Sequence, residues 1–257
     1  MLWSYGITCV PSRFDTTLPH TLASLAKAGF DKPRLFIDGD PRRIIIQECT
    51  VRNPKVGPWG NWYLSLLELY IREPVCERYA IFQDDVIAVR GLREYLEACR
   101  YPDGKDGREP GFWNLFTFLN SEWDADMGCG WIQGAVNVSE PEGQLQCCRG
   151  ALGLVFNREA VQIILSSRFC VGKAADANRP QTNIDGCVVT AMNMHRRPLN
   201  PDDERRWPRG WREYVHGPSL LSHIGTQSSL PTGKVWQKNT ELFPGEEFDA
   251  KTLVKRD

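Results

Sequence analysis

Apolar runs and amphipathic stretches alternate along the first third of the chain. The apolar runs are continuous, which is typical of strands buried on both faces of a sheet. They lie at residues 2–10, 34–37, 79–82 and 86–89, with a shorter run at 44–46. Leucines and tyrosines spaced three and four residues apart predict helices over 17–29 and 61–72, capped by Thr17 and Asn61. This alternation predicts an α/β fold with a mostly parallel, Rossmann-like central sheet flanked by helices.

The second half of the chain is less regular. Residues 100–150 are glycine-rich and polar around two aromatic runs, so we expect a loop-rich insertion in a single domain. The tail beyond Asn200 is irregular. Predicted strands lie at 112–118, 130–133 and 149–156, and predicted helices run from a cap at Asn157 to about Ser166 and from Asn183 to about Met194.

Two adjacent acids, Asp84 and Asp85, directly follow the predicted strand at 79–82. Neighbouring carboxylates repel each other and resist desolvation, so a divalent cation or full solvation in a tight turn must compensate them. Arg13 and Asp38 also follow predicted strands. Because parallel strands end at one edge of a sheet, where ligands bind, we expect these side chains to lie close together.

Composition and charge narrow the choice of partners. The 257 residues contain 31 Lys and Arg against 32 Asp and Glu, so no global field directs the protein to nucleic acid or an anionic membrane. No apolar stretch approaches the roughly 18 residues of a membrane-spanning helix. Nine cysteines without a C-x-x-C pair predict reduced thiols rather than a disulfide framework or zinc site. A soluble, cytoplasmic protein is the expectation.

Five motifs in order carry a resemblance to a known class of enzyme. The motifs are a first strand ending near Arg13, Gln83-Asp84-Asp85, Gly150-Ala151-Leu152-Gly153, Asn183-Ile184-Asp185 and His223-Ile224-Gly225-Thr226-Gln227-Ser228-Ser229. The series resembles the GT-A fold glycosyltransferases over most of residues 2–230, and its last motif resembles the end of the N-acetylglucosaminyltransferase IV family.

The resemblance implies a domain over residues 1–230, followed by a tail at 231–257. Its nucleotide-sugar half covers about 1–99 and its acceptor half about 100–230. The implied donor is a nucleoside-diphosphate sugar, expected to be a UDP-sugar.

The resemblance also implies a metal site. In such enzymes the acidic triplet binds a divalent metal, usually Mn²⁺ and otherwise Mg²⁺, which bridges the donor diphosphate. Asp85 is then the direct ligand, His223 completes the metal shell, and Asp84 contacts the ribose or a metal-bound water. Gln83 departs from the acid that usually opens the triplet. Read without the resemblance, His223 is a hydrogen-bonded loop histidine, and His216 is a competing ligand.

Asp185 is the catalytic base that the resemblance implies. In an inverting enzyme this carboxylate removes the proton of the acceptor hydroxyl as the hydroxyl attacks the sugar. An acid in the first turn of a helix is also stabilised by the helix dipole, which gives Asp185 a purely structural interpretation. Asn183 is the predicted helix cap in both cases.

Four further residues are predicted to bind the donor. Gly150 and Gly153 lack side chains, which lets the sugar approach the backbone, although a bulge or a packing constraint also explains them. Arg13 is expected to contact phosphate and Asp38 the base. A surface salt bridge is the alternative for each.

The acceptor is either a glycan or a hydroxymethylated DNA base. Residues 195–212 interleave arginines with Trp207 and Trp211, which can bind phosphates and stack on bases, but neighbouring acids dilute the charge. The alternative is a carbohydrate groove lined by tryptophans of the insertion. These are Trp113, Trp123 and Trp131, and the pair Asp124 and Asp126 beside them is the second candidate metal site.

Two other classes of function compete with the glycosyltransferase. A nucleotidyltransferase uses a similar sheet, but its glycine-rich, lysine-bearing phosphate loop is missing after the first strand. A non-catalytic carbohydrate- or nucleic-acid-binding module would not need Asp185.

Overall fold

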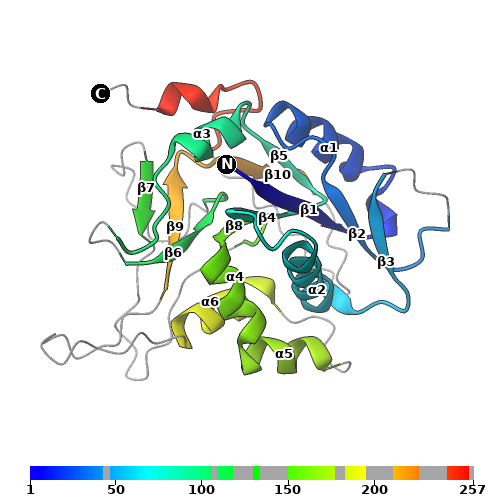
Figure 1. Cartoon of the computed structure of the whole chain (residues 1–257). Coiled ribbons are helices and arrows are strands. Elements are labelled where there is room, and N and C mark those ends of the chain that lie inside the picture. Colours follow the sequence, from blue (N-terminus) through cyan, green and yellow to red (C-terminus); the bar gives the residue numbers. More distant parts are fainter. Residues whose placement is uncertain are drawn as a thin grey trace, which may run out of the picture.

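The computed structural model describes eight segments of the chain and shows a mixed α/β domain (Figure 1). These segments are residues 1–42, 47–105, 109–117, 130–133, 150–176, 183–194, 211–225 and 242–254. Their strands are β1 (Trp3–Cys9), β2 (Arg34–Asp38), β3 (Cys49–Arg52), β4 (Arg78–Gln83), β5 (Val86–Ala88), β6 (Gly111–Asn114), β7 (Gly130–Gln133), β8 (Gly153–Asn157), β9 (Arg212–Gly217) and β10 (Leu221–His223).

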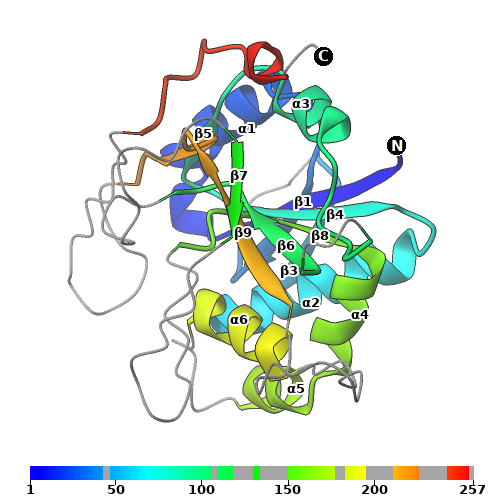
Figure 2. The ribbon, with the colours of Figure 1, turned by 90° about the vertical axis from the view of Figure 1, so that its left-hand side faces the viewer.

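Helices flank this sheet on both faces. They are α1 (Thr17–Lys27), α2 (Gly57–Arg72), α3 (Leu92–Ala98), α4 (Arg158–Ser166), α5 (Arg168–Ala175) and α6 (Ile184–Met194), with short 3₁₀ turns η1 (Pro11–Arg13) and η2 (Ala250–Leu253). Figure 2 shows α1 and α3 above the sheet and α2, α4, α5 and α6 below it. In the described segments, no helix is both long and apolar enough to cross a membrane.

The central sheet has the strand order β3-β2-β1-β4-β8-β6-β9-β7. Strands β1 to β4 are mutually parallel, β8 runs antiparallel to both β4 and β6, and β9 is parallel to β6. Only β8 and β7 therefore oppose the common direction within this sheet. The predicted mostly parallel sheet flanked by helices is confirmed.

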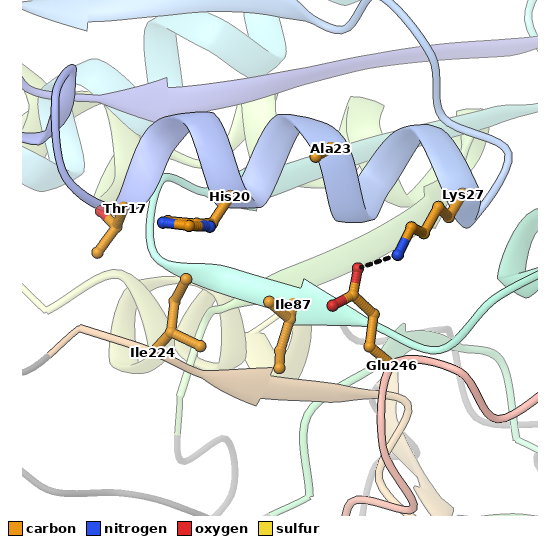
Figure 3. A pocket seen from close by; sticks show the side chains of 7 residues that line it. All are labelled: Thr17, His20, Ala23, Lys27, Ile87, Ile224 and Glu246. Carbon is orange, nitrogen blue, oxygen red and sulfur yellow. Dashed lines mark ion pairs between the residues drawn. The ribbon is translucent and has the colours of Figure 1, made fainter.

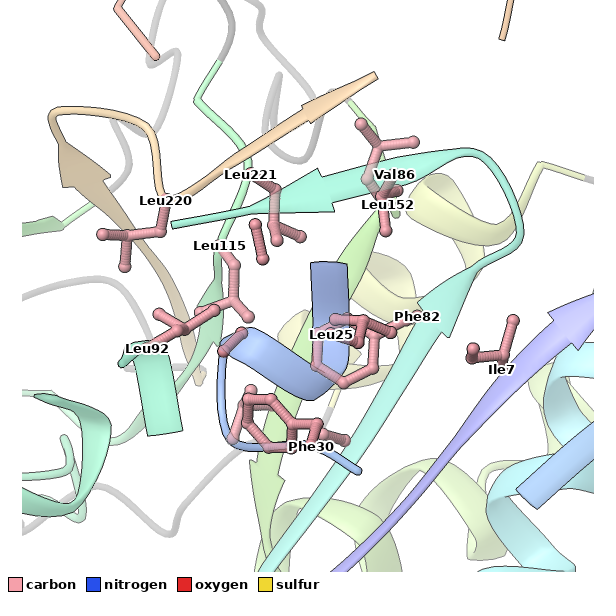
Figure 4. Close-up of a cluster of buried hydrophobic side chains, with 14 of the residues drawn as sticks. Ile7, Leu25, Phe30, Phe82, Val86, Leu92, Leu115, Leu152, Leu220 and Leu221 are labelled. Atoms are coloured by element: carbon pink, nitrogen blue, oxygen red, sulfur yellow. The ribbon is translucent and has the colours of Figure 1, made fainter. Parts of the chain in front are cut away.

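Alternation along β4 divides its side chains between two cores. Ala80 and Phe82 pack in the core under α1 and α3, whereas Tyr79 and Ile81 pack in the core that covers α2, α4 and α6. Figure 4 shows part of the first core, in which Phe82 lies near Leu25 of α1. A central strand that is apolar on both faces produces the continuous hydrophobic run seen in the sequence.

The chain leaves the central sheet immediately after the acid pair and continues into strand β5. This strand forms a separate antiparallel ribbon with β10, in which Ile87 pairs with Ser222. Its other edge faces α1, where Thr21 Oγ1 and Ser24 Oγ accept hydrogen bonds from the backbone N–H groups of Val86 and Ala88. Helix hydroxyls thus satisfy strand donors that would otherwise be buried without partners.

The C-terminal segment 242–254 packs on the α1 and α3 side. Ala250 is fully buried, and Phe243 and Phe248 contact the core. The backbone N–H of Arg90 lies 3.1 Å from the Glu246 carbonyl and 3.0 Å from the Phe248 carbonyl, and donates to both.

The strands and helices predicted in the first third are largely confirmed, but both predicted helix caps are wrong. Thr17 does not cap α1, because it is already the first helical residue and its hydroxyl has no hydrogen-bond partner in the described segments. Asn61 lies inside α2, where its Nδ2 donates to the Phe36 carbonyl. The neighbouring strand to β2 is β3, whereas the run at 44–46 lies outside the described residues.

The predictions for the second half of the chain are also confirmed in part. The Asn157 cap is confirmed, since its Oδ1 accepts a hydrogen bond of 2.8 Å from the Ala160 N–H. The expectation of an irregular tail is wrong for residues 211–225, because β9 lies inside the sheet and β10 forms the ribbon with β5, while residues 200–210 and 226–241 lie outside the described segments. The six cysteines in the described segments are all free, as expected, and those that are buried are Cys9, Cys76, Cys170 and Cys187.

Candidate functional site

Polar side chains from three parallel strands gather at one edge of the sheet. Asp38 is the last residue of β2, Asp84 and Asp85 follow β4, and Arg13 ends the turn after β1. Arg13 and Asp85 form an ion pair, with 3.2 Å between Nη2 and Oδ2, and both side chains are largely buried. The structure thus confirms that Arg13 lies beside the acid pair.

The ribbon of β5 and β10 brings His223 to the same carboxylate. His223 pairs with Val86, and the backbone N–H of Ile224 donates to the Asp85 carbonyl over 2.8 Å. As a result His223 Nε2 lies 3.0 Å from Asp85 Oδ2, although 138 positions separate the two residues. The structure therefore joins the two predicted metal ligands.

Asp85 and His223 each have one buried polar atom without a hydrogen-bond partner in the described segments. These atoms are Asp85 Oδ1 and His223 Nδ1. Buried polar atoms without partners cost free energy unless a ligand satisfies them. His223 Nε2 and Asp85 Oδ2 already form a hydrogen bond of 3.0 Å with each other, which is the bond expected of His223 as a loop histidine, so the atoms left for a ligand are Asp85 Oδ1 and His223 Nδ1.

Asp85 and His223 fit a metal ion whose remaining ligands come from the substrate. No group of three or more His, Cys, Asp or Glu side chains in the described segments is arranged to hold a metal. Mg²⁺ and similar hard cations commonly bind one or two carboxylates and take their remaining ligands from phosphate and water. One carboxylate and one imidazole are consistent with that pattern.

Asp84 has a strongly raised pKa. Burial and the neighbouring charge of Asp85 raise the pKa of Asp84 from 3.8 to about 7, against the lowering effect of the Val10 N–H. That N–H donates to Asp84 Oδ2 over 2.9 Å. The free protein therefore stores electrostatic repulsion at this edge, and a cation would relieve it.

Gly225 completes the site and was not singled out from the sequence. A Cβ atom at this position would lie 2.5 Å from Asp85 Oδ2 and 3.0 Å from both Arg13 Nη1 and His223 Cε1. Only a residue without a side chain fits there. The glycine within the His223-Ile224-Gly225 motif was the available signal, but its contact with Asp85 depends on a long-range pairing.

We expect Gly225→Ala to weaken cation binding by at least about tenfold, because the methyl group displaces the Asp85 carboxylate and a shift of about 1 Å is costly at such sites. Titration of Mn²⁺ by isothermal calorimetry measures the effect. Gly172→Ala is the matched control, since a Cβ at Gly172 meets nothing within 4 Å. Unchanged Mn²⁺ affinity in Gly225→Ala contradicts a cation site at Asp85 and His223.

Asp185 lies at the start of α6, as predicted. Its backbone N–H donates to Asn183 Oδ1 over 3.0 Å, which confirms the predicted Asn183 cap. Its own Oδ2 accepts a hydrogen bond of 2.5 Å from the Gly150 N–H. The predicted base and the predicted glycine motif are therefore in direct contact.

The structure gives the other predicted donor-binding residues packing partners. A Cβ at Gly150, whose φ is +96°, would lie 2.7 Å from the Phe116 ring, and one at Gly153 would lie 2.4 Å from Leu221 Cδ1. Asp38 accepts hydrogen bonds from the N–H groups of Val56 and Gly57 at the start of α2. Donor contacts by these residues stay a prediction.

His216 is not a metal ligand. It is fully buried, its Nδ1 lies 2.7 Å from the Pro218 carbonyl, and its Nε2 lies 2.6 Å from the Tyr95 hydroxyl. Burial lowers the pKa of His216 from 6.5 to about 4, so the ring is neutral, with Nδ1–H donating and Nε2 accepting.

We expect His216 to make the fold acid-sensitive. Below pH 6.5 the unfolded chain binds a proton that the folded ring does not accept, so stability is lost as the pH falls from 6.5 towards 4, by up to ~3 kcal/mol. The free energy of unfolding, measured by urea denaturation, should fall more steeply with decreasing pH in the wild type than in His216→Gln. His20→Gln, on the exposed part of α1, should keep the wild-type slope; equal slopes in all three proteins contradict the assignment.

Several candidates for acceptor binding are structural or lie outside the described residues. Trp211 is buried, and Arg212 pairs with Glu109 over 3.0 Å. Trp113 is also buried and stacks on Trp131 at 4.8 Å between ring centroids. The remaining candidates lie outside the described segments, namely Trp123, Asp124, Asp126, Trp207 and the arginines from 196 to 209.

A groove of about 460 Å³ adjoins the site through Ile224 (Figure 3). It runs between α1 and the β5–β10 ribbon, and Ile87 contributes to its apolar wall. An ion pair of 3.4 Å between Lys27 and Glu246 lies at one end. None of the residues predicted to bind donor or metal lines this groove.

Comparison with known proteins yields similar structures only. The sequence matches no protein-family model and no curated protein. A mannose-1-phosphate geranyltransferase from Thermus thermophilus is 13% identical with a TM-score of 0.46, covering 84% of this chain and 74% of its own. A197 from STIV is 14% identical with a TM-score of 0.42, covering 88% and 86%.

A third similar structure is a nucleoside-diphosphate-sugar pyrophosphorylase from Vibrio cholerae. It is 10% identical with a TM-score of 0.42, covering 99% of this chain and 100% of its own. Similarities this low assign no activity to the chain.

Proposed function

We propose that this protein is a divalent-cation-dependent glycosyltransferase. It transfers a sugar from a nucleoside-diphosphate sugar, most simply a UDP-sugar, to an acceptor hydroxyl. The observation that carries the proposal is the pair of Asp85 and His223. Their side chains form a hydrogen bond of 3.0 Å, and other buried atoms of both side chains have no partners within the described segments.

The proposed cation is Mn²⁺ or Mg²⁺, held by Asp85 and His223. When bound, it neutralises the negative charge that develops on the departing nucleoside diphosphate. Arg13, already beside Asp85, binds the diphosphate, and Asp84 binds ribose hydroxyls or water. Asp38 supports the donor pocket through the start of α2, which it holds in place.

The residues on the α6 side act on the acceptor. Asp185 accepts the proton of the attacking hydroxyl while the Gly150 N–H holds its Oδ2. Gly150 contributes by holding Asp185, and the space beside Gly153 is filled by Leu221. Attack on the side opposite the leaving group makes the reaction inverting. The acceptor is a glycan or a hydroxymethylated base in DNA.

The segment after β1 argues against a nucleotidyltransferase. It reads Pro11-Ser12-Arg13-Phe14-Asp15 and begins with a 3₁₀ turn, with neither glycine nor lysine. A phosphate loop needs glycines so that successive backbone N–H groups can surround the phosphates. In a purely binding module, Asp185 would only satisfy the Gly150 N–H and the helix dipole, so Asp185→Asn separates that class from the transferase.

A thermal-shift experiment with UDP tests the proposal. We expect UDP with Mn²⁺ to stabilise the protein by ~2.7 kcal/mol at a hundredfold excess over Kd, and UDP with EDTA to do so far less. Asp85→Ala should remove this Mn²⁺-dependent gain. Asp31→Ala, at an exposed position, should retain it. Equal stabilisation with and without Mn²⁺, or a full gain in Asp85→Ala, contradicts the proposal.

A panel of nucleotide sugars then identifies the donor. Glycosyltransferases with a bound donor transfer sugar slowly to water, so release of the nucleoside diphosphate can be measured before the acceptor is known. We expect hydrolysis of one donor that depends on Mn²⁺. Release of pyrophosphate from a nucleoside triphosphate and a sugar phosphate would instead support the nucleotidyltransferase.

A further inference from the structure

A chain of hydrogen bonds leads from Asp185 into the core of the sheet. Asp185 Oδ2 accepts from the Gly150 N–H over 2.5 Å, and the Gly150 carbonyl accepts from Asn114 Nδ2 over 3.1 Å. The same Nδ2 donates to Glu213 Oε1 over 2.7 Å. Strands β6 and β9 thereby connect to the first turn of α6.

The partners of Asn114 fix the orientation of its amide. One acceptor of Nδ2 is a backbone carbonyl, which cannot donate, and the other is Glu213 Oε1, while Asn114 Oδ1 accepts from the Phe116 N–H over 3.1 Å. The group therefore has one arrangement that satisfies these three partners. Asn114 is 1% and Glu213 6% exposed. A polar pair buried this deeply is costly unless it is fully bonded, and when bonded it is rigid.

Glycine is the residue that this arrangement requires at position 150. Its φ of +96° is available to glycine, and the Phe116 ring occupies the space of a Cβ. Phe116 is itself held by the hydrogen bond from its N–H to Asn114. Asn114 thus fixes Gly150 directly through its carbonyl and indirectly through the neighbouring ring.

We propose that Asn114 and Glu213 are positioning residues that orient the Asp185 carboxylate through Gly150. The inference rests on the proposed function for the role of Asp185 as base. Glu213 holds the amide of Asn114, Asn114 holds Gly150, and the Gly150 N–H holds Asp185 Oδ2, which leaves the carboxylate in one orientation towards the acceptor. Neither Asn114 nor Glu213 contacts the substrate.

Asn114→Asp tests the inference, because it keeps the shape of the side chain and replaces its donor group by an acceptor facing two other acceptors. We expect kcat for transfer to fall about 10- to 100-fold, with the KM for donor and the Mn²⁺-dependent thermal shift unchanged. Glu213→Gln keeps an acceptor oxygen for Asn114 and should retain near-wild-type kcat. Glu213→Met removes that oxygen and should resemble Asn114→Asp, which gives a second variant if the first fails to fold.

A double variant separates positioning from general damage to the fold. If Asn114 acts through Asp185, adding Asn114→Asp to Asp185→Asn causes no further loss of kcat. A further loss as large as that of Asn114→Asp in the wild type overturns the inference.

Nuclear magnetic resonance gives a readout that does not depend on the reaction. The Gly150 amide proton should titrate with the Asp185 carboxylate in the wild type and in Glu213→Gln, and should lose this titration in Asn114→Asp. An unchanged titration in Asn114→Asp overturns the inference whatever the enzyme does. Loss of the titration in a protein that transfers no sugar upholds the positioning chain and rejects the proposed function alone.

Discussion

Replacing Asp185 by Asn should lower the rate of sugar transfer by about 10²- to 10⁴-fold, the usual contribution of a general base. The amide keeps the size of the carboxylate, and its oxygen can still accept the hydrogen bond from the Gly150 N–H. It cannot take a proton from the acceptor hydroxyl. Steady-state kinetics with donor, Mn²⁺ and acceptor measure kcat, while the thermal shift with UDP and Mn²⁺ should match that of the wild type.

The matched control for Asp185→Asn is another acid in the first turn of a helix. Glu159 occupies that place in α4. Glu159→Gln removes the favourable interaction with the helix dipole but should leave transfer unchanged. If Asp185→Asn transferred sugar at the wild-type rate, Asp185 would be only a dipole-stabilising acid, and another base or a retaining mechanism would be needed.

Local patterns were sufficient to predict the edge where the site lies. The apolar runs of β1, β2 and β4 are each followed within a few residues by a charged side chain, and parallel strands end at one edge of a sheet, so Arg13 and Asp85 were expected to be neighbours. The first and last residues of the helices were harder to predict. The helix was predicted to begin at Asn61, whereas α2 begins at Gly57 with Pro58 in its first turn.

Long-range pairing was beyond local patterns. The β10 strand is three residues long, and its pairing with β5 is what places His223 on Asp85 and Gly225 beside both. Periodicity over so short a segment carries almost no signal. The sequence did contain a weak signal for the pair of Asn114 and Glu213. Asn114 interrupts the aromatic run at 112–118, and a polar residue in a buried strand implies a specific partner.

The acid pair should also make the free protein less stable than it need be. The pKa of Asp84 is raised to about 7 in the folded protein from 3.8, so the folded state holds a proton that the unfolded chain has released. The contribution of Asp84 is therefore fully present below pH 3.8 and is lost as the pH rises to about 7. Above that pH the charged carboxylate costs at most ~4 kcal/mol.

Asp84→Asn should accordingly stabilise the protein in EDTA at about pH 8 by up to ~4 kcal/mol, and by much less at about pH 4, because the amide does not ionise. Its oxygen can still accept the hydrogen bond from the Val10 N–H. Urea unfolding at both pH values measures the difference. Asp103→Asn is the control of opposite sign, since Lys105 lowers the pKa of Asp103 and its charge is favourable.

The same variant should bind UDP with Mn²⁺ more weakly than the wild type, so that stability rises while ligand binding falls. That combination is expected of a residue retained for a ligand rather than for the fold, because the bound cation offsets the repulsion between Asp84 and Asp85. If Asp84→Asn were no more stable at about pH 8, the acids would already be compensated in the free protein. The electrostatic reason for a cation at this edge of the sheet would then be lost.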